Sequence, residues 1–311
     1  MVRKTATLIL FLVIANVYGQ VTGDVFVMNK DRDVFYVHYT PEINNSDAFD
    51  YQRISSKLSF PLFRKRLSLF NTIGMDYHSF SFGSQFQPSI LNAKEEYFSV
   101  NYSLLANYKI SKNWSLNALL MPYANGSFNR SLESEDIHFN GILFAEKRFT
   151  SKNKQNTYLL SFGVGYLTLS GEKRVNPVVN FMGSIGHKLT FAIGLPNTYV
   201  KYDFNQKHSI KVLGDLNDFS FRLTNQRDND RYANVSQSIF TTVSAGVEYN
   251  YWLSRTIGVL VRGTHSVFEK YEFQDSNEEV IYGMDVPLRA YISVGLKVNP
   301  FRGRRPNIPR K

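Results

Sequence analysis

The segment from Phe98 to Ile110, FSVNYSLLANYKI, carries the pattern that decides the fold. Its first residue and every second residue after it are apolar or aromatic, while the residues between them, apart from Leu105, are Ser, Asn or Lys. Because successive side chains of a β-strand point to opposite faces, this alternation predicts one apolar face and one polar face. The alternation runs for 13 residues, whereas an ordinary strand has about 5–6. The segment is therefore predicted to be a long strand between two different environments.

The same alternation recurs along the chain. Segments 158–168, 239–251 and 288–298 each place apolar residues at every second position. In segment 210–223 the apolar positions are even-numbered up to Leu216 and odd-numbered from Phe219 onward. One extra residue in a strand shifts the parity in this way, so we predict a β-bulge beside Asn217-Asp218.

The connections between these segments differ in length. Short polar turns are expected at 63–65, 111–113, 186–188 and 254–255, and longer Asn-, Ser- and Asp-rich stretches at 125–136 and 224–237. Long strands with short turns at one end and long loops at the other are typical of bacterial outer-membrane β-barrels. In lipid every backbone polar group must be paired within the protein, and a sheet meets this demand only by closing on itself. A soluble β-sandwich also alternates, but its strands are shorter.

These patterns predict an all-β, antiparallel, up-and-down transmembrane barrel of about twelve strands. The strands are expected near 32–40, 51–62, 66–80, 96–110, 113–123, 137–149, 157–169, 177–185, 208–224, 237–252, 256–270 and 287–299. Segment 189–205 leaves the count open, because it could form a further pair of strands, which would make about fourteen, or an insertion at the rim. Aromatic residues near strand ends are expected to form girdles at the two membrane interfaces. They are Tyr108, Trp114, Tyr158, Tyr166, Tyr249, Tyr251 and Trp252.

The N-terminus has the three parts of a secretory signal peptide. Arg3 and Lys4 supply the basic region, residues 7–15 (TLILFLVIA) the apolar region, and Val17 and Gly19 the small residues before a cleavage site. The apolar region is too short to span a bilayer core of ~30 Å. We therefore expect an exported protein located in the cell outer membrane. Its parts are a signal peptide (1–19), an outer-membrane β-barrel (20–301) and a basic C-terminal tail (302–311).

The composition excludes several classes of protein. Among its 311 residues the chain has no Cys, 25 Phe and 19 Tyr. A mean hydropathy of −0.26 does not fit a bundle of transmembrane helices, and so many aromatic residues do not fit a disordered chain. The lack of Cys excludes a disulfide scaffold, a thiolate metal site and a Cys nucleophile.

The positive charge is concentrated at the C-terminus. The net charge of +10 falls to +8 without Arg3 and Lys4, and five of the remaining cationic side chains lie in the tail 302–311. A basic tail can contact anionic lipid or nucleic acid. In an exported protein we expect a solvated tail or an envelope contact, with outer-membrane lipid as the main partner, small solutes as possible cargo and no nucleic acid.

Three short stretches support a family resemblance. The Gly19-Gln20 end of the signal peptide, the stretch Gly194–Tyr202 (GLPNTYVKY) and the closing Lys297–Phe301 (KVNPF) resemble the uncharacterised outer-membrane β-barrel proteins of Bacteroidota. That family is described only as a domain of unknown function. The resemblance implies an outer-membrane barrel over most of the mature chain and transfers no catalytic residue. The chain departs from many such barrels, which end on the aromatic residue of the last strand, because ten residues follow Phe301.

The sequence gives little support to catalysis. Barrel phospholipases place His and Ser two residues apart on one strand, but none of the six His residues is followed by Ser at that distance. Barrel aspartyl-type proteases use Asp-x-Asp and Asp-x-His pairs, and the chain has Asp76-x-His78, Asp136-x-His138 and Asp228-x-Asp230. This spacing puts both members of a pair on one face, so an envelope hydrolase is kept as a remote alternative. We predict no enzyme, no cofactor and no metal site, because the His residues are scattered singly.

The polar parity of the strands predicts a charged lumen. Its expected members are Asp76, His78, Lys109, Glu146, Arg148, Glu248, Arg262, Arg289 and Lys297. Across the hairpin around Ser254, Glu248 is expected opposite or diagonal to Arg262 and in an ion pair with it, with Arg289 on the next strand.

Two interpretations of this lumen remain open. It is either the charged constriction of a narrow diffusion channel for small solutes, or a polar network that fills the interior of a structural or surface-interaction barrel. About twelve strands enclose much less space than a 16-stranded porin, which favours the filled interior. The sequence leaves the solute, the binding partner and the oligomeric state open.

Overall fold

The computed structural model describes residues 25–28, 31–41, 49–82, 94–128, 131–153, 155–169, 172–194, 198–223, 234–286 and 288–302. The predicted signal peptide, the tail beyond Arg302 and the Asp228-x-Asp230 pair lie outside these residues. In the described part of the chain, no helix is long and apolar enough to cross a membrane.

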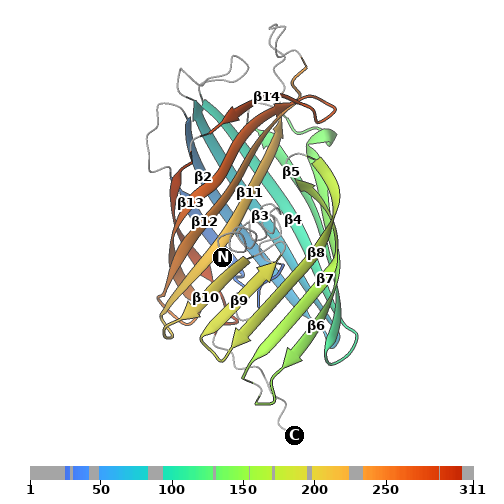
Figure 1. The fold of residues 1–311 in the computed structure, drawn as a ribbon, viewed down its shortest axis with the longest axis vertical. Coiled ribbons are helices and arrows are strands. Elements are labelled where there is room, and N and C mark those ends of the chain that lie inside the picture. The colour runs from blue at the N-terminus through green and yellow to red at the C-terminus, as the bar shows by residue number, and fades with distance from the viewer. Residues whose placement is uncertain are drawn as a thin grey trace, which may run out of the picture.

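Antiparallel strands form one sheet that closes on itself (Figure 1). Neighbours in sequence pair from β1 to β13, and β15 completes the ring by pairing with both β13 and β1. Since β14 pairs with β13 outside this ring, fourteen of the fifteen strands make up the barrel wall. The strands are β1 (Phe35–Thr40), β2 (Phe49–Phe63), β3 (Leu67–Phe82), β4 (Lys94–Lys109), β5 (Trp114–Ser127), β6 (Ile137–Thr150), β7 (Thr157–Leu169), β8 (Glu172–Ile185), β9 (Leu189–Gly194), β10 (Thr198–Asp203), β11 (His208–Arg222), β12 (Gln237–Trp252), β13 (Ile257–Gln274), β14 (Val280–Asp285) and β15 (Ala290–Val298), with a short 3-10 helix η2 (Ser134–Asp136) before β6.

The structure decides between the two predicted strand counts. β9 and β10 are the additional pair that segment 189–205 allowed, so fourteen strands are confirmed and twelve is wrong. β8 begins at Glu172 rather than near 177, and β14 was not predicted. The charged residues Glu172–Arg174 and Pro177 concealed the start of β8, because both kinds of residue are uncommon inside strands.

The outer face of the barrel is apolar. In β12, Val247 and Tyr249 are exposed on the outside, whereas Glu248 and Asn250 are buried on the inside. Other exposed apolar side chains of the described strands are Ile54, Leu58, Ile73, Met75, Val100, Leu116, Leu120, Leu143, Val179, Ile193, Val200, Val212, Val261, Val294 and Leu296. A closed sheet with an apolar exterior meets the physical demands of a bilayer, because it leaves no backbone edge and presents hydrocarbon to hydrocarbon.

The predicted aromatic girdles are present in part. Exposed on the outer face are Tyr108, Trp114, Tyr166 and Tyr249, while Tyr158 and Tyr251 are half-buried. The prediction that Trp252 belongs to a girdle is wrong, because its side chain is 2% exposed and faces the lumen. It shares the parity of Glu248, and the Nζ of Lys297 lies 5.2 Å from the centre of its ring.

The parity change in β11 has a different cause from the predicted one. β11 pairs with β12 without interruption over His208–Arg222, so the β-bulge expected beside Asn217-Asp218 is not there. Odd-numbered residues are buried toward both ends of the strand, with Ser209 at 0% and Phe219 and Phe221 at 2% exposed. The register irregularity of this region lies instead between β12 and β13, at Val243. The change in parity therefore records a lumen that turns from polar to aromatic along the strand.

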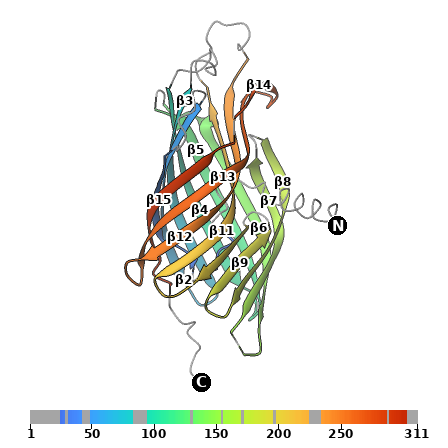
Figure 2. The ribbon, with the colours of Figure 1, turned by 60° about the vertical axis from the view of Figure 1, so that its left-hand side comes forward.

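The two ends of the barrel differ as the loop lengths predicted (Figures 1 and 2). The turns 64–66, 110–113, 186–188 and 253–256 lie at one end, where β1 begins and β15 ends; we call this the short-turn end. Longer connections, namely 41–48, 83–93, 128–136 and 223–236, join strands at the opposite end, which we call the long-loop end.

The β9–β10 hairpin is too short to line the full height of the wall (Figure 2). Its last rungs toward the long-loop end are Asn180↔Gly194 with β8 and Thr198↔Gly214 with β11. Beyond these rungs, toward the long-loop end, β11 comes close to β5. There Nδ2 of Asn125 on β5 donates a 2.6 Å hydrogen bond to the carbonyl of Ser220 on β11. The lumen is therefore narrowed in its long-loop half.

Candidate functional site

The predicted ion pair is present in the short-turn half of the lumen. Glu248 of β12 stands directly opposite Arg262 of β13. Both Nε and Nη2 of Arg262 donate to Oε2 of Glu248, at 3.0 and 2.6 Å. The side chain of Glu248 is 5% exposed, so the carboxylate is held by cations rather than by water.

Further charges extend this pair into a band across the lumen wall, which we call the ion-pair band. Lys297 of β15 places its Nζ 3.5 Å from Oε1 of Glu248, and Lys211 of β11 pairs with Glu248 in the strand register. Asp215 lies 3.6 Å from Arg262. The band therefore combines charges of both signs on β11, β12, β13 and β15.

Arg289 does not join this band, which corrects its predicted place. The rung opposite Arg262 on β15 is Ser293, while Arg289 lies nearer the long-loop end and its backbone bonds with Ser266. Lys297 takes the position that Arg289 was expected to have. The sequence could not set this register, because the stretch before β15 contains Pro287 and leaves the strand start open.

Asp76 and His78 are both inside the barrel and have partners on β2. Arg53 binds Oδ1 of Asp76 through Nε at 2.9 Å and Nη2 at 2.6 Å. The hydroxyl of Tyr51 and Nδ1 of His78 share a 2.9 Å hydrogen bond. His78 is 0% exposed. Neither Arg53 nor Tyr51 was singled out from the sequence, although both share the inward parity of β2.

The remaining predicted lumen charges lie elsewhere. Lys109, Ser115 and Glu146 are cross-strand neighbours on β4, β5 and β6 near the short-turn end. Glu146 accepts a 3.5 Å hydrogen bond from Ser115, while Lys109 and Arg148 are exposed. These three charges are not brought to the ion-pair band.

The inner face of the wall formed by β5 to β9 carries a cluster of apolar residues, with polar residues such as Asn117, Ser161 and Asn180 between them. Its buried residues include Leu119, Ile142, Phe144, Leu159, Leu167, Val178, Met182 and Ala192. The chain itself covers this surface with residues 25–28 and 31–34, which we call the N-terminal segment. Phe26 is 0% exposed, and its ring centre lies 4.9 Å from that of Phe144.

The N-terminal segment also binds the charged wall. Oδ1 of Asp31 accepts a 2.5 Å hydrogen bond from Lys201 of β10, and Asp33 lies 4.0 Å from Lys297. The guanidinium of Arg32 lies 4.3 Å above the ring of Phe70. Apolar residues thus meet the apolar wall and charged residues the charged wall, so the segment fills the space between them. This contact was not predicted, and the only sign of it in the sequence is the charged run Asp31-Arg32-Asp33 at the start of the strand expected near 32–40.

Aromatic side chains fill the long-loop half of the lumen. The aromatic cluster consists of Tyr51, Phe80, Phe82, Tyr97, Phe219, Phe221, Phe240, Tyr271, Phe273 and Tyr291, with Val235, Met284 and Val286. Rings from opposite walls touch: the centres of Tyr97 on β4 and Phe221 on β11 are 3.4 Å apart, and those of Phe80 on β3 and Tyr271 on β13 are 5.7 Å apart. Side chains from opposite walls therefore meet across the lumen at this level.

The two Asp-x-His pairs are held by separate neighbours. Asp76 binds Arg53, whereas Oδ2 of Asp136 accepts a 2.8 Å hydrogen bond from the amide of Glu133. His78 lies in the aromatic cluster, stacked on Phe219, and His138 packs against Tyr123. Each pair is thus fixed by contacts in its own part of the barrel. Among the residues that the structure describes, there is no group of three or more His, Asp or Glu residues arranged to hold a metal ion.

The barrel resembles several solved structures at low similarity. NanC porin covers 85% of this chain and 98% of its own at 10% identity and a TM-score of 0.38. KdgM porin in complex with disordered oligogalacturonate covers 85% and 98% at 8% identity and 0.36. A Pseudomonas aeruginosa FadL homologue covers 85% and 89% at 8% identity and 0.40. These values are too low to carry an argument about function.

The family comparison is more specific. A search of the curated proteins finds no match. The model of a domain of unknown function, DUF6268, matches residues 35–299, which run from the start of β1 to the end of β15. The resemblance to a barrel family without known activity is thereby confirmed, while an origin in Bacteroidota stays a prediction. The chain belongs to the DUF6268 family.

Proposed function

We propose that this protein is an outer-membrane β-barrel with a closed lumen, a plugged scaffold rather than an open pore. The observation that carries the proposal is the aromatic cluster. Phe80 and Tyr271 are 0% exposed and Tyr97 is 1% exposed, although all three point into the space through which a solute would pass. Dispersion contacts among buried rings and the burial of about 150–250 Å² per ring stabilise this closed arrangement.

The N-terminal segment supports the same proposal in the other half of the lumen. It lies between the two walls, anchored by the Asp31–Lys201 ion pair and by Phe26 in the apolar wall. A solute would have to displace both the rings and this segment. The long loops then remain as the part of the molecule that can meet partners outside the membrane.

The location in the outer membrane rests on two features. The apolar exterior and the closed ladder of β1 to β15 suit a bilayer. The basic, apolar and small residues of positions 1–19 suit export with cleavage after Gly19.

Single-channel recording tests the closed lumen. The mature protein is refolded, shown to be a folded barrel by its heat-dependent gel mobility, and added to a planar bilayer. We expect no discrete conductance steps from the wild-type protein. Regular steps from a folded wild-type barrel would overturn the proposal.

Two variants test whether the aromatic cluster is the reason for a lack of conductance steps in the wild-type protein. Tyr97→Ala with Phe221→Ala removes the rings that stack at 3.4 Å across the lumen, and we expect it to raise the frequency of conductance steps. Val164→Ala changes a side chain that is 53% exposed on the outer face and serves as the control. If both variants stay as silent as the wild type although folded, the aromatic cluster is not what closes the barrel.

A narrow, gated channel is the second candidate. The ion-pair band favours this candidate, because charged side chains of both signs line the lumen, as they do in the charged constriction of a selective channel. In that case Glu248→Gln would change the ion selectivity of the steps recorded from the Tyr97→Ala, Phe221→Ala variant. We expect no hydrolase activity, since the carboxylates of Asp76 and Asp136 already bind Arg53 and the Glu133 amide.

A further inference from the structure

The turns at the short-turn end carry positive charge and no acidic residue. Each of the connections 64–66, 110–113, 151–156, 186–188, 204–207 and 253–256 contains at least one Lys or Arg, and none contains Asp or Glu. Every one of these turns has an exposed cation, namely Arg64, Lys112, Lys152, Lys188, Lys207 and Arg255. We call these residues the basic collar. Like charges gathered at one end of a molecule attract anions to that end.

The long-loop end has the opposite charge. Its connections 41–48, 128–136, 223–236 and 275–279 contain ten Asp or Glu residues and three Lys or Arg residues. The net charge of the chain conceals this difference, because the contributions of the two ends partly cancel. The electropositive surface therefore belongs to the short-turn end.

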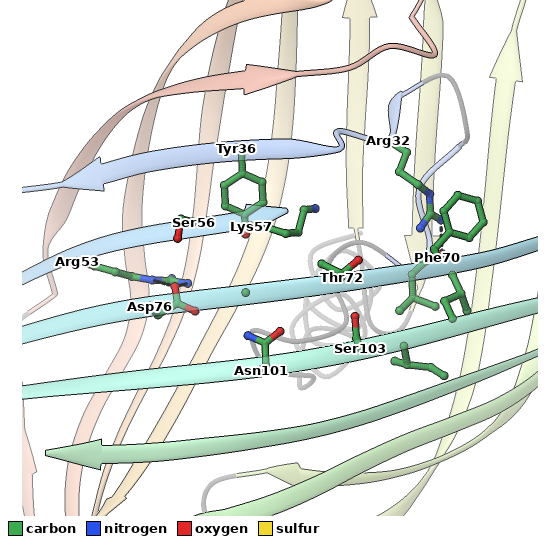
Figure 3. Close-up of a pocket in the computed structure, with 14 residues that line it drawn as sticks. Arg32, Tyr36, Arg53, Ser56, Lys57, Phe70, Thr72, Asp76, Asn101 and Ser103 are labelled. Carbon is green, nitrogen blue, oxygen red and sulfur yellow. Dashed lines mark hydrogen bonds and ion pairs between the residues drawn. The ribbon is translucent and has the colours of Figure 1, made fainter. Parts of the chain in front are cut away.

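Carboxylates near the basic collar lie inside the barrel. At the strand ends beside the turns, Asp203 lies 3.2 Å from Lys201, and Glu146 accepts a 3.5 Å hydrogen bond from Ser115. Deeper in the lumen, Arg53 points at Asp76 and binds it (Figure 3). Such inward charges meet inward partners, whereas the cations of the collar are exposed.

Lys147 brings positive charge onto the outer face of the barrel. It lies on β6 with the parity of Phe139 and Leu143, which are 46% and 51% exposed. Its Nζ lies 5.2 Å from the ring centre of Trp114 and 5.3 Å from that of Phe149. Both rings are exposed on this face. Since Trp side chains on a membrane-facing surface lie at the level of the lipid headgroups, the ammonium of Lys147 is placed at the depth of the lipid phosphates.

Two lysines of the collar lie beside this group. The turn that holds Lys112 is bound to β6 by a 2.8 Å hydrogen bond from the backbone N–H of Arg148 to the carbonyl of Asn113. Lys152 lies in the turn that follows β6. Together with Lys147, these residues place three cations at the same end of neighbouring strands.

We propose that the basic collar and Lys147 bind the headgroups of anionic phospholipids, with the closest contact at Lys147 and Trp114. Short turns of outer-membrane barrels face the periplasm, so the bound lipid belongs to the periplasmic leaflet. An acidic protein could reach the turns, but the bilayer covers the face on which Lys147 lies among exposed rings. The position of Lys147 therefore favours a lipid partner. This inference rests on the proposed location in the outer membrane.

The fluorescence of Trp114 measures which lipids lie beside it. The chain has two Trp residues, and Trp252 is buried in the lumen, so a Trp252→Phe parent protein leaves Trp114 as the single Trp. The full mature parent protein is refolded into vesicles of phosphatidylcholine and phosphatidylglycerol, with brominated acyl chains on one lipid or the other. Bromine quenches Trp fluorescence on contact, so the two titrations give the relative association constant of the two headgroups.

We expect phosphatidylglycerol to be favoured about fivefold or more at low salt, because each cation near an anionic surface contributes about this factor. Lys147→Gln should lower the preference about twofold or more. The triple variant Lys112→Gln, Lys147→Gln, Lys152→Gln should bind both lipids equally. In 1 M NaCl the preference of the parent protein should fall, since the Debye length shortens to about 3 Å.

A matched control changes a lysine at the other end of the barrel. Lys94→Gln alters a side chain at the start of β4 that is 61% exposed and should leave the preference unchanged. Equal association of both lipids with the parent protein, or an unchanged preference in the folded triple variant, would overturn the inference. Loss of the preference when polyglutamate is present on both sides of the membrane would also overturn it and assign the collar to an acidic protein.

The outcomes separate this inference from the proposed function. If neither brominated lipid quenches Trp114, the barrel is not in the bilayer, and the proposed location falls together with the inference. If both lipids quench it equally, the inference alone is wrong. The conductance result is independent of both titrations, because it depends on the aromatic cluster.

Discussion

The long-loop half and the short-turn half of the lumen are filled by different kinds of side chain, although most strands of the wall run through both. In the long-loop half, rings of β3 and β4 meet rings of β11 to β13, with Phe80 and Tyr271 completely buried. In the short-turn half, the ion-pair band covers one wall and the N-terminal segment covers the other.

The height of the β9–β10 hairpin explains the difference. Where β9 and β10 are present, the wall has its full number of strands and leaves a space that the N-terminal segment fills. Above Gly194 and Thr198 the ladder to β8 and β11 stops, and β11 comes close to β5. Opposite walls are then near enough for aromatic side chains to touch, so no inserted segment is required there.

The largest effect is expected from emptying the aromatic cluster. Phe80→Ala removes a ring that contacts Tyr51, Tyr97, Phe240 and Tyr271. The loss in the free energy of unfolding should be about 3–5 kcal/mol, because a cavity is left in a closely packed core. Urea titration of the refolded barrel, followed by Trp fluorescence, measures it.

A substitution of similar volume sharpens that result. Phe80→Leu keeps an apolar side chain in the same place and should cost less than about 1.5 kcal/mol. If Phe80→Ala were no more destabilising than Phe80→Leu, the rings would be poorly packed and the long-loop half would not be closed as we describe.

The sequence predicted well which strand residues point into the lumen, but it predicted poorly which residues contact each other across the lumen. Alternation identified the inward residues of β12 and β13, and the turn between them fixed the Glu248–Arg262 pair to within one rung. It could not place Asp31 against Lys201, because these residues are 170 positions apart and no hairpin relates them. The alternation along each strand thus predicts the wall of the barrel. The contacts that fill the lumen join residues far apart in the sequence, and they form only once the sheet has closed.

The aromatic closure did leave a local signal. Phe80 and Phe82 share the inward parity of Asp76 and His78 on β3, as Phe219 and Phe221 share that of Lys211 on β11. The second case resembles a β-bulge in the sequence, because one extra residue would shift the parity in the same way. When the apolar positions of a barrel strand change parity, the inward residues can have changed from polar to aromatic without any β-bulge, as they do in β11.

An effect of comparable size is expected from breaking the ion-pair band. Glu248→Gln leaves the positive charges of Arg262, Lys211 and Lys297 without their common carboxylate. Removal of one partner of a buried pair costs about 3 kcal/mol or more, largely because of the charge left behind.

The double variant Glu248→Gln, Arg262→Met tests whether the two effects are coupled. It should be less destabilised than the sum of the two single variants, since it removes both charges together. Strict additivity in urea titrations would mean that the residues do not act as a buried pair.

The smallest effect is expected from weakening the contact between the N-terminal segment and β10. Lys201→Met removes the cation that binds Asp31, and a hydrogen bond to a charged group contributes about 1.5–3 kcal/mol. Because the N-terminal segment lies outside the paired strands of the wall, the loss should appear as local opening rather than as global unfolding. Hydrogen exchange should therefore become faster at residues 25–33 and stay unchanged in β3 and β12, whereas Lys65→Met should alter neither region. Faster exchange spread evenly over β10, β11 and β12 would show instead that Lys201 supports the wall rather than the N-terminal segment.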